Sequence, residues 1–270
     1  MPNPATLEEA WREALVGTPP SWKRLRKIFG HIPSGPRCKN YHAPFAGPGR
    51  LIVGSLMGFK RWEKNPHFCG RCLGGMVDRG LGGAEIELSM LFADIRGSTT
   101  IAEGMSASAF GGLLGRFYHE AMRVLVTQDA TIDKFVGDEV VALFLPGFSG
   151  QDHARHALKA AEDLLVVTGH RDRGGPWLPV GIGVHAGVAY VGAVGSSADD
   201  ADLTALGDAV NTAARFASRA RTGEIVVSLA SLMAAGRSTD GLRLESAELK
   251  GKAEPVEVAV LSVGRLDQPD

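Results

Sequence analysis

Residues 88–99 read LSMLFADIRGST, an apolar run that ends at Asp94 and is followed at once by turn-forming residues. The run predicts a buried strand, and the glycine and hydroxyl residues after it predict a tight turn. Taken alone, an acid where a strand leaves the core is usually an exposed turn residue. The same position is also suited to a polar site, and the rest of the sequence decides between these interpretations.

The region from residue 85 onward alternates between strand and helix patterns. Strands are predicted over 85–95, 131–136, 139–145, 224–229, 241–249 and 255–263, with two more inside 178–195, and helices over 107–128, 152–167 and 207–220. Gly137-Asp138 joins two of these strands as a tight hairpin. The order strand, helix, strand, strand, helix, strand indicates an α/β (α+β) fold with a ferredoxin-like βαββαβ core and a C-terminal αβ extension.

The first 84 residues differ from the rest in charge. Residues 1–80 carry a net charge of +8, and the remainder carries −9. Short helices are predicted over 6–15 and 21–30. We therefore expect a helical extension over 1–30, a small cysteine-containing module over 31–84 and a larger domain over 85–265. The two parts either dock on each other or present solvated faces, or the basic part meets an anionic surface or regulatory partner.

Composition narrows the class of protein. With 44% hydrophobic and 22% charged residues, the chain is typical of globular proteins. It contains no apolar stretch of the roughly 20 residues that span a bilayer, and its N-terminus lacks a signal-peptide pattern. We expect a cytoplasmic protein without a transmembrane segment and without a nucleic-acid partner.

All three cysteines lie between residues 38 and 72. Cys69 and Cys72 have the C-x-x-C spacing of half a zinc site, and Cys38 supplies a third thiolate. A fourth ligand would have to be a histidine, with His42 the first choice by proximity and His67 the second. A structural Zn²⁺ is therefore expected here, and a disulfide or unliganded cysteines are the alternatives.

The predicted topology places a second acid, Asp138, close to Asp94. The strand that ends at Asp94 and the hairpin with Asp138 at its tip lie side by side in a ferredoxin-like sheet. Two carboxylates at one edge repel each other unless a cation neutralises them, and Mg²⁺ or Mn²⁺ prefers such oxygens. Gly97, Ser98 and Thr99 then offer backbone N–H groups to phosphates.

Three segments carry a family likeness: FADIRGST (92–99), DKFVGDEVVALF (133–144) and TALGDAVNTAAR (204–215). In this order, they resemble the catalytic domain of class III nucleotidyl cyclases of bacterial type, which are adenylate and guanylate cyclases. The N-terminal part resembles a zinc-ribbon-like module, although position 41 is Tyr where such modules generally carry a second cysteine.

The resemblance implies a metal site with two Mg²⁺ or Mn²⁺ ions. Asp94 and Asp138 match the family's metal-binding aspartates, with the carbonyl of Ile95 as a further ligand. Lys250 matches a lysine that contacts phosphate, and Lys252 is close enough to compete for this assignment.

The resemblance also implies residues that bind and transform a nucleotide. Lys134 and Thr204 match positions that recognise the base, and a threonine at the second position resembles a subgroup that makes cyclic AMP. Asn211 and Arg215 match the pair that orients the ribose and stabilises the transition state. Four residues apart on a helix, they project from one face.

The resulting expectation is an adenylate cyclase that converts ATP to 3′,5′-cyclic AMP and pyrophosphate. Family members divide one site between two subunits, so a homodimer with two shared sites is implied. A cyclase acting on GTP or a pyrimidine triphosphate, and a catalytically silent nucleotide-sensing module, are the alternatives. We expect His185 to be structural.

Overall fold

A computed structural model describes residues 4–17, 20–32, 36–63, 65–72, 82–194, 202–249, 252 and 254–264. The main sheet is organised around β3 (Gly83–Ile95). Met90 and Phe92 enter the hydrophobic cluster on one face of β3, and Leu91 and Ala93 enter the cluster on the other. Since successive side chains of a strand point to opposite faces, the unbroken apolar run reflects a strand covered on both sides.

The main sheet has eight strands in the order β4-β5-β3-β6-β8-β10-β9, and β7 pairs with β6 outside this path. The other strands are β4 (Thr131–Val136), β5 (Glu139–Phe144), β6 (Val180–Val194), β7 (Asp202–Leu206), β8 (Glu224–Ser228), β9 (Arg243–Ala247) and β10 (Val256–Ser262). The pairings of β3 with β5 and β6 and of β4 with β5 confirm the predicted ferredoxin-like core.

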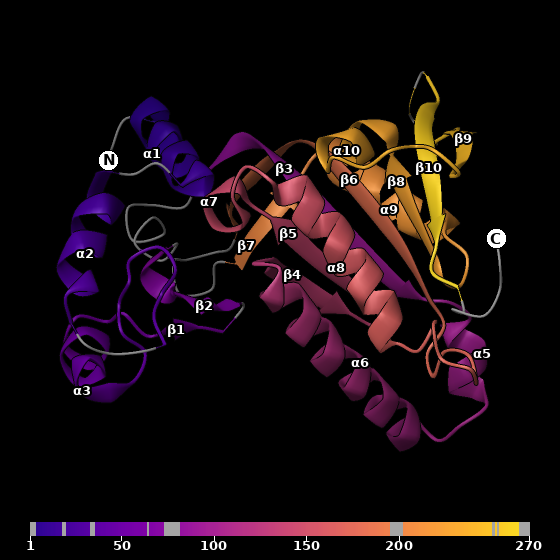
Figure 1. Ribbon diagram of the computed structural model, residues 1–270, viewed down its shortest axis with the longest axis horizontal. Coiled ribbons are helices and arrows are strands. Elements are labelled where there is room, and N and C mark those ends of the chain that lie inside the picture. Colours follow the sequence, from indigo (N-terminus) through magenta and orange to yellow (C-terminus); the bar gives the residue numbers. More distant parts are fainter. Residues whose placement is uncertain are drawn as a thin grey trace.

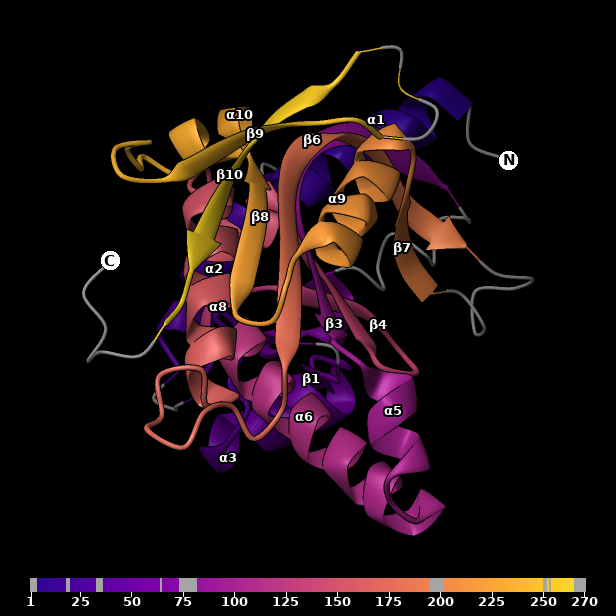
Figure 2. The same ribbon diagram turned by 90° about the vertical axis from the view of Figure 1, so that its right-hand side faces the viewer.

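Helices cover both faces of the sheet. In Figure 1, α6 (Ala107–Thr127) and α8 (His153–Val167) lie across one face. Figure 2 shows α9 (Asp208–Arg219) alongside β6 on the other face. The shorter helices are α5 (Ser98–Glu103), α7 (Pro146–Ser149) and α10 (Leu229–Ala234). Among the described residues, no helix is both long enough and apolar enough to cross a membrane.

The prediction of two strands within 178–195 was wrong, because β6 is one continuous strand. Its glycines allow a close approach of α9. A Cβ atom on Gly183 would lie 2.3 Å from the backbone nitrogen of Ala217 and 2.4 Å from the carbonyl oxygen of Ala213. Gly183 is therefore needed for helix packing, and the chain does not turn there.

The N-terminal part lies at one end of the sheet (Figure 1). It contains α1 (Pro4–Val16), α2 (Pro20–Gly30), α3 (Gly47–Gly49), the π-helix η1 (Arg50–Leu56), β1 (Arg61–Trp62), β2 (Asn65–Cys69) and the 3₁₀ turn η2 (Gly70–Cys72). Trp11, Phe59 and Phe68 belong to the same hydrophobic cluster as β3. The division into segments 1–30, 31–84 and 85–265 stays a prediction.

Candidate functional site

Three carboxylates gather where β3 and the β4–β5 hairpin end. Asp94 pairs in register with Glu139, and the N–H of Ile95 donates a hydrogen bond to the carbonyl of Asp138 at 3.2 Å. Burial raises the pKa of Asp94, and the charge of Asp138 adds to this effect. Burial, Asp94 and Asp138 likewise raise the pKa of Glu139. Carboxylate oxygens under mutual repulsion suit Mg²⁺ or Mn²⁺, so the chemistry of these donors fits such an ion. Among the described residues, however, only the three cysteines form a ligand group with atoms within 4.8 Å of one another.

Arg96 is the cation closest to this acid cluster among the ion pairs of the described residues. Its guanidinium lies 2.6 Å from the Asp94 carboxylate and opposes the rise in the pKa of Asp94. The same side chain donates to the carbonyls of Ser218 at 3.3 Å and Ala220 at 3.5 Å. Arg96 thus connects Asp94 to the C-terminal end of α9, where unsatisfied carbonyls attract positive charge.

The tip of the β4–β5 hairpin is held by α6. Gly137 has φ = 59°, which a glycine adopts without strain, and this allows a two-residue loop that presents Asp138. The hydroxyl of Tyr118 donates to the carbonyl of Gly137, and the Tyr118 ring packs on Phe135 at 4.7 Å between centroids. Burial, and then Asp138, raise the pKa of Tyr118. Tyr118 therefore fixes the position of the loop that carries an acid.

Lys134 and Thr204, predicted as a pair, meet through a third residue. Asp133 is buried, and one of its carboxylate oxygens accepts a hydrogen bond from the Thr204 hydroxyl at 3.2 Å and lies 3.3 Å from the Lys134 ammonium. A bulge between Ile132 and Lys134 shifts the register of β4 at this point. Asp133 is not among the site residues predicted from the sequence, although it is an acid inside the predicted strand TIDKFV (131–136).

Asn211 and Arg215 lie on α9 as predicted. The helix packs on the sheet through its buried residues Ala209, Thr212, Ala213, Phe216 and Ala217. Asn211 is exposed and Arg215 is half-buried, so both lie on the side of α9 that is turned away from the sheet. Within the described chain, no carboxylate lies within ion-pair distance of Arg215.

Only some of the residues predicted to contact phosphate lie within the described part of the chain. Lys250 lies outside the described residues. The ammonium of Lys252 lies 2.6 Å from the Asp208 carboxylate at the start of α9. Gly97 has φ = 67° and immediately precedes α5, whose first turn contains Ser98 and Thr99.

His185 lies against α9 and has structural contacts. Its Nδ1 atom lies 2.9 Å from the Ser228 hydroxyl, and its ring meets Phe216 edge-on. Burial, followed by the charge of Lys252, lowers the pKa of His185 to about 4. The side chain is therefore neutral at neutral pH, in line with a packing role.

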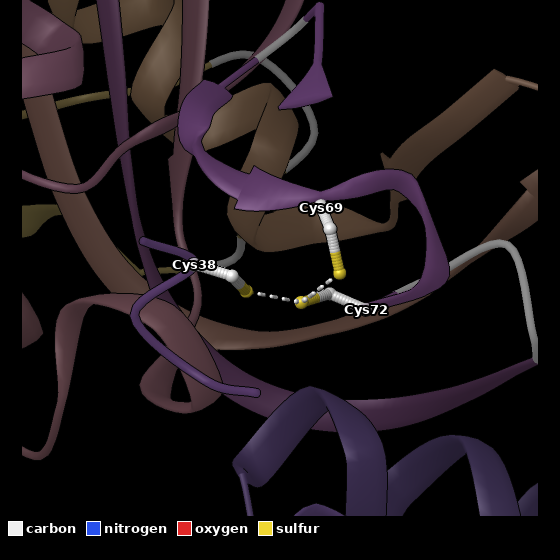
Figure 3. A group of neighbouring side chains, drawn as sticks. All are labelled: Cys38, Cys69 and Cys72. Atoms are coloured by element: carbon white, nitrogen blue, oxygen red, sulfur yellow. Dashed lines mark hydrogen bonds between the residues drawn. The ribbon is translucent and has the colours of Figure 1, made fainter. Parts of the chain in front are cut away.

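The three cysteines form a second candidate site in the N-terminal part. All three thiols are free and buried, and their sulfur atoms lie within 4.8 Å of one another. Hydrogen bonds from Cys69 and Cys72 lower the pKa of Cys38, whereas burial raises the pKa of Cys72. Figure 3 shows the three side chains pointing toward a common centre.

The predicted histidine ligands lie elsewhere. Neither His42 nor His67 belongs to the group of possible metal ligands that the described residues form around the thiols. His42 has φ = 58°, and its Nδ1 atom lies beside Gly30 of α2. The Nδ1 atom of His67 lies 3.2 Å from the Asp129 carboxylate. The structure therefore brings together three of the four residues expected in the zinc site.

Comparison with known families identifies the part of the chain from residue 84 to residue 261. The family model of the adenylate and guanylate cyclase catalytic domain matches residues 84–261. Adenylate cyclase 1 of Rhizobium meliloti (strain 1021) is 34% identical over 135 residues, which cover 48% of this chain and 20% of that protein. An adenylate cyclase of Anabaena cylindrica is 34% identical over 137 residues, which cover 48% of this chain and 26% of that protein.

Solved structures agree with the family model. The guanylyl cyclase Cya2 has a TM-score of 0.59 and 29% identity, covering 69% of this chain and 97% of that one. The adenylyl cyclase CyaB from P. aeruginosa has a TM-score of 0.57 and 27% identity, covering 69% of this chain and 99% of that one.

Proposed function

Because the chain belongs to the family of adenylate and guanylate cyclase catalytic domains, we propose that it is an adenylate cyclase, which converts ATP to 3′,5′-cyclic AMP and pyrophosphate. The observation that carries this proposal is the convergence of Asp94 and Asp138 at one end of the sheet, where β3 and the β4–β5 hairpin end. In the reaction, the ribose 3′-oxygen forms a bond to the α-phosphorus, and the bond to pyrophosphate breaks.

Asp94 and Asp138, with the Ile95 carbonyl, would hold two Mg²⁺ or Mn²⁺ ions. When bound, these ions lower the pKa of the ribose 3′-hydroxyl and neutralise the triphosphate. Arg96 already provides one positive charge to Asp94, so it would have to share or give up this carboxylate. Glu139 adds a further negative charge, which favours cation uptake.

Lys134 and Thr204 are the proposed base-recognition residues. Their shared contact with Asp133 supports this role, because a buried carboxylate that bonds both side chains limits where each can point. A hydroxyl at position 204 can both donate and accept a hydrogen bond, which suits the edge of adenine. The choice of ATP rests on this threonine and on the family likeness.

Asn211 and Arg215 are the proposed catalytic residues. Since they are four residues apart on α9, they reach toward one ligand. Asn211 would orient the ribose, and Arg215 would offset charge that develops on the α-phosphate. Arginine suits this task because its guanidinium stays charged and donates two bonds at once. Removing such a group typically costs about 10²–10³ in rate.

We also propose that two copies of the chain share each site. Asn211 and Arg215 face away from the sheet, whereas Arg96 lies between Asp94 and the end of α9 of the same chain. A second copy can bring its own α9 to the acids without displacing this contact. Val188, Tyr190 and Leu206 support association, because they are exposed on one face of the β6–β7 hairpin.

Product analysis tests the substrate. The full chain is incubated with Mn²⁺ and ATP, GTP, CTP or UTP separately, and the products are identified by mass spectrometry. Cyclic AMP from ATP is expected. Another cyclic nucleotide as the main product would overturn the choice of ATP, and the absence of any product from a folded chain that binds nucleotide would indicate a silent sensing module.

Complementation tests the shared site. An Asp138→Ala chain and an Arg215→Ala chain are each expected to be inactive alone. Their mixture can form one intact site per dimer, so activity should return. A verified mixed dimer without activity would contradict the proposed division of the site.

A further inference from the structure

The thiols of Cys38, Cys69 and Cys72 converge from two separate segments of the chain. The Cys38 and Cys72 sulfurs are 3.5 Å apart, and the Cys69 and Cys72 sulfurs are 3.6 Å apart. Cys38 precedes a turn in which the N–H of His42 donates to the Cys38 carbonyl. Cys69 is the last residue of β2, and Cys72 is the last residue of η2. All three side chains are at most 1% exposed.

These separations suit one metal ion. Two thiolates bound to a tetrahedral zinc at about 2.3 Å lie about 3.8 Å apart, close to the observed values. A disulfide would require sulfurs about 2.05 Å apart. In a 4Fe–4S cluster each cysteine binds a different iron, and in a 2Fe–2S cluster only two cysteines share one iron. Three sulfur atoms within 4.8 Å of one another therefore fit one shared ion better than either cluster.

One backbone N–H group points at the cluster. The backbone N–H of Tyr41 donates to the Cys38 sulfur at 3.4 Å, as outer-shell donors do for thiolate ligands. The aromatic ring of Tyr41 packs edge-on against Phe59, which keeps this turn in place. Soft thiolate ligands select zinc and other thiophilic ions over Mg²⁺ or Ca²⁺.

We propose that Cys38, Cys69 and Cys72 bind one Zn²⁺ as thiolates and that neither His42 nor His67 is a ligand. Both histidines have other neighbours, because His42 lies beside Gly30 and His67 contacts Asp129. The fourth position belongs to a ligand other than these two side chains.

The metal would tie together a part of the chain that has little regular structure. β1 has 2 residues and η2 has 3, and short elements of this kind depend on a staple for stability. Because the ligands come together only in the folded chain, the binding energy contributes to folding. The residue after Cys38, Lys39, lies 2.6 Å from the Asp129 carboxylate. The cluster therefore lies next to the contacts that hold the segment before β4.

Metal analysis of cysteine and histidine variants tests the proposal. The full chain is purified in the presence of a reductant and without chelators, and its metals are measured by mass spectrometry. One zinc per chain is expected. Cys38→Ser, Cys69→Ser and Cys72→Ser should lose the metal, whereas His42→Ala and His67→Ala, as matched controls, should keep it. A zinc-free reduced protein, or loss of zinc from either histidine variant, would overturn the proposal.

A titration of the wild-type chain covers the case in which the cysteine variants do not fold. Chelator-treated, reduced protein is titrated with Cd²⁺, and thiolate-to-metal absorption is followed. Saturation at one ion per chain is expected, with all three thiols protected from alkylation. Failure to saturate at one ion, or a native disulfide between any two of these cysteines, would refute the site.

Discussion

The guanidinium of Arg96 lies 2.6 Å from the Asp94 carboxylate, and the same guanidinium bonds the carbonyl of Ala220 at the end of α9. One side chain therefore neutralises a proposed metal ligand and also caps the helix that carries Asn211 and Arg215. The two proposed half-sites of each chain are physically connected through Arg96.

Replacing Arg96 should make the acid cluster bind cations more tightly. Arg96→Ala removes the charge that competes for Asp94, so half-maximal activity should require several-fold less Mn²⁺. It also removes the cap on α9, so the thermal midpoint should fall by a few degrees. Activity is measured against Mn²⁺ concentration, with Arg123→Ala on the exposed side of α6 as the control. A higher Mn²⁺ requirement would contradict competition between Arg96 and the metal.

Asp133 should control how the nucleotide base is recognised. Asp133→Asn weakens the contacts with Lys134 and Thr204 without a large change in volume. A charge-assisted hydrogen bond contributes about 1.5–3 kcal/mol, so KM for ATP should rise about tenfold or more while kcat changes less. Thr204→Val should have a smaller effect in the same direction. An unchanged KM and an unchanged preference among the four triphosphates would show that Asp133 has no part in base binding.

Tyr118 should act on the reaction through the hairpin tip. Tyr118→Phe removes only the hydroxyl that bonds the Gly137 carbonyl, next to Asp138. The loss of about 1 kcal/mol of positioning energy should lower kcat about fivefold. The free energy of unfolding should change by less than about 1 kcal/mol. Thr127→Val, which removes a hydroxyl at the far end of α6, serves as the control and should leave kcat unchanged.

Leu206 should belong to the contact between two copies of the chain. It is 52% exposed on β7, and Leu244 on β9 is 50% exposed. Leu206→Glu places a charge in the proposed interface and should shift the protein toward monomers without activity. Leu244→Glu is matched in exposure and in chemical change, and it should remain dimeric. The oligomeric state of both variants is measured by sedimentation. If both variants have the same oligomeric state, the interface does not include Leu206.

Acid should destabilise the protein partly through His185. Burial lowers the pKa of His185 from 6.5 to about 4, so the native state favours the neutral ring. The stability from this preference is complete above pH 6.5 and is lost as the pH falls toward 4. It amounts to at most about 3 kcal/mol. Denaturant unfolding across this interval should show a shallower loss for His185→Gln. If the free energy of unfolding falls equally steeply with pH in the wild-type protein and in His185→Gln, His185 does not contribute to the loss of stability in acid.

The fold could be predicted where side-chain alternation and turn residues agree. The run around Met90, the hairpin at Gly137 and the helix with Asn211 and Arg215 are all readable from local sequence. The prediction divided β6 into two strands at a glycine, whereas the strand is continuous and its Gly183 admits α9. A packing requirement between distant segments has no local signal.

In the candidate site too, some residues could be predicted from the sequence, and others are placed by contacts between distant segments. Asp94 and Asp138 could be paired because the topology brings strand ends together. Arg96 and Tyr118 could not, since the first reaches carbonyls more than 120 residues away and the second contacts a loop 19 residues away. His42 was chosen by proximity along the chain, but the left-handed backbone at that residue turns it toward α2.

Asp129 lies two residues before β4 with φ = 58°, and its carboxylate contacts Lys39 and His67 of the N-terminal part. The N-terminal part and the segment that leads into the β4–β5 hairpin thus meet at Asp129. A chimera that grafts a foreign front end onto this domain would leave Asp129 in a costly conformation without its two basic neighbours. Exchange of the N-terminal part therefore requires the contacts of Asp129 with Lys39 and His67 to be preserved.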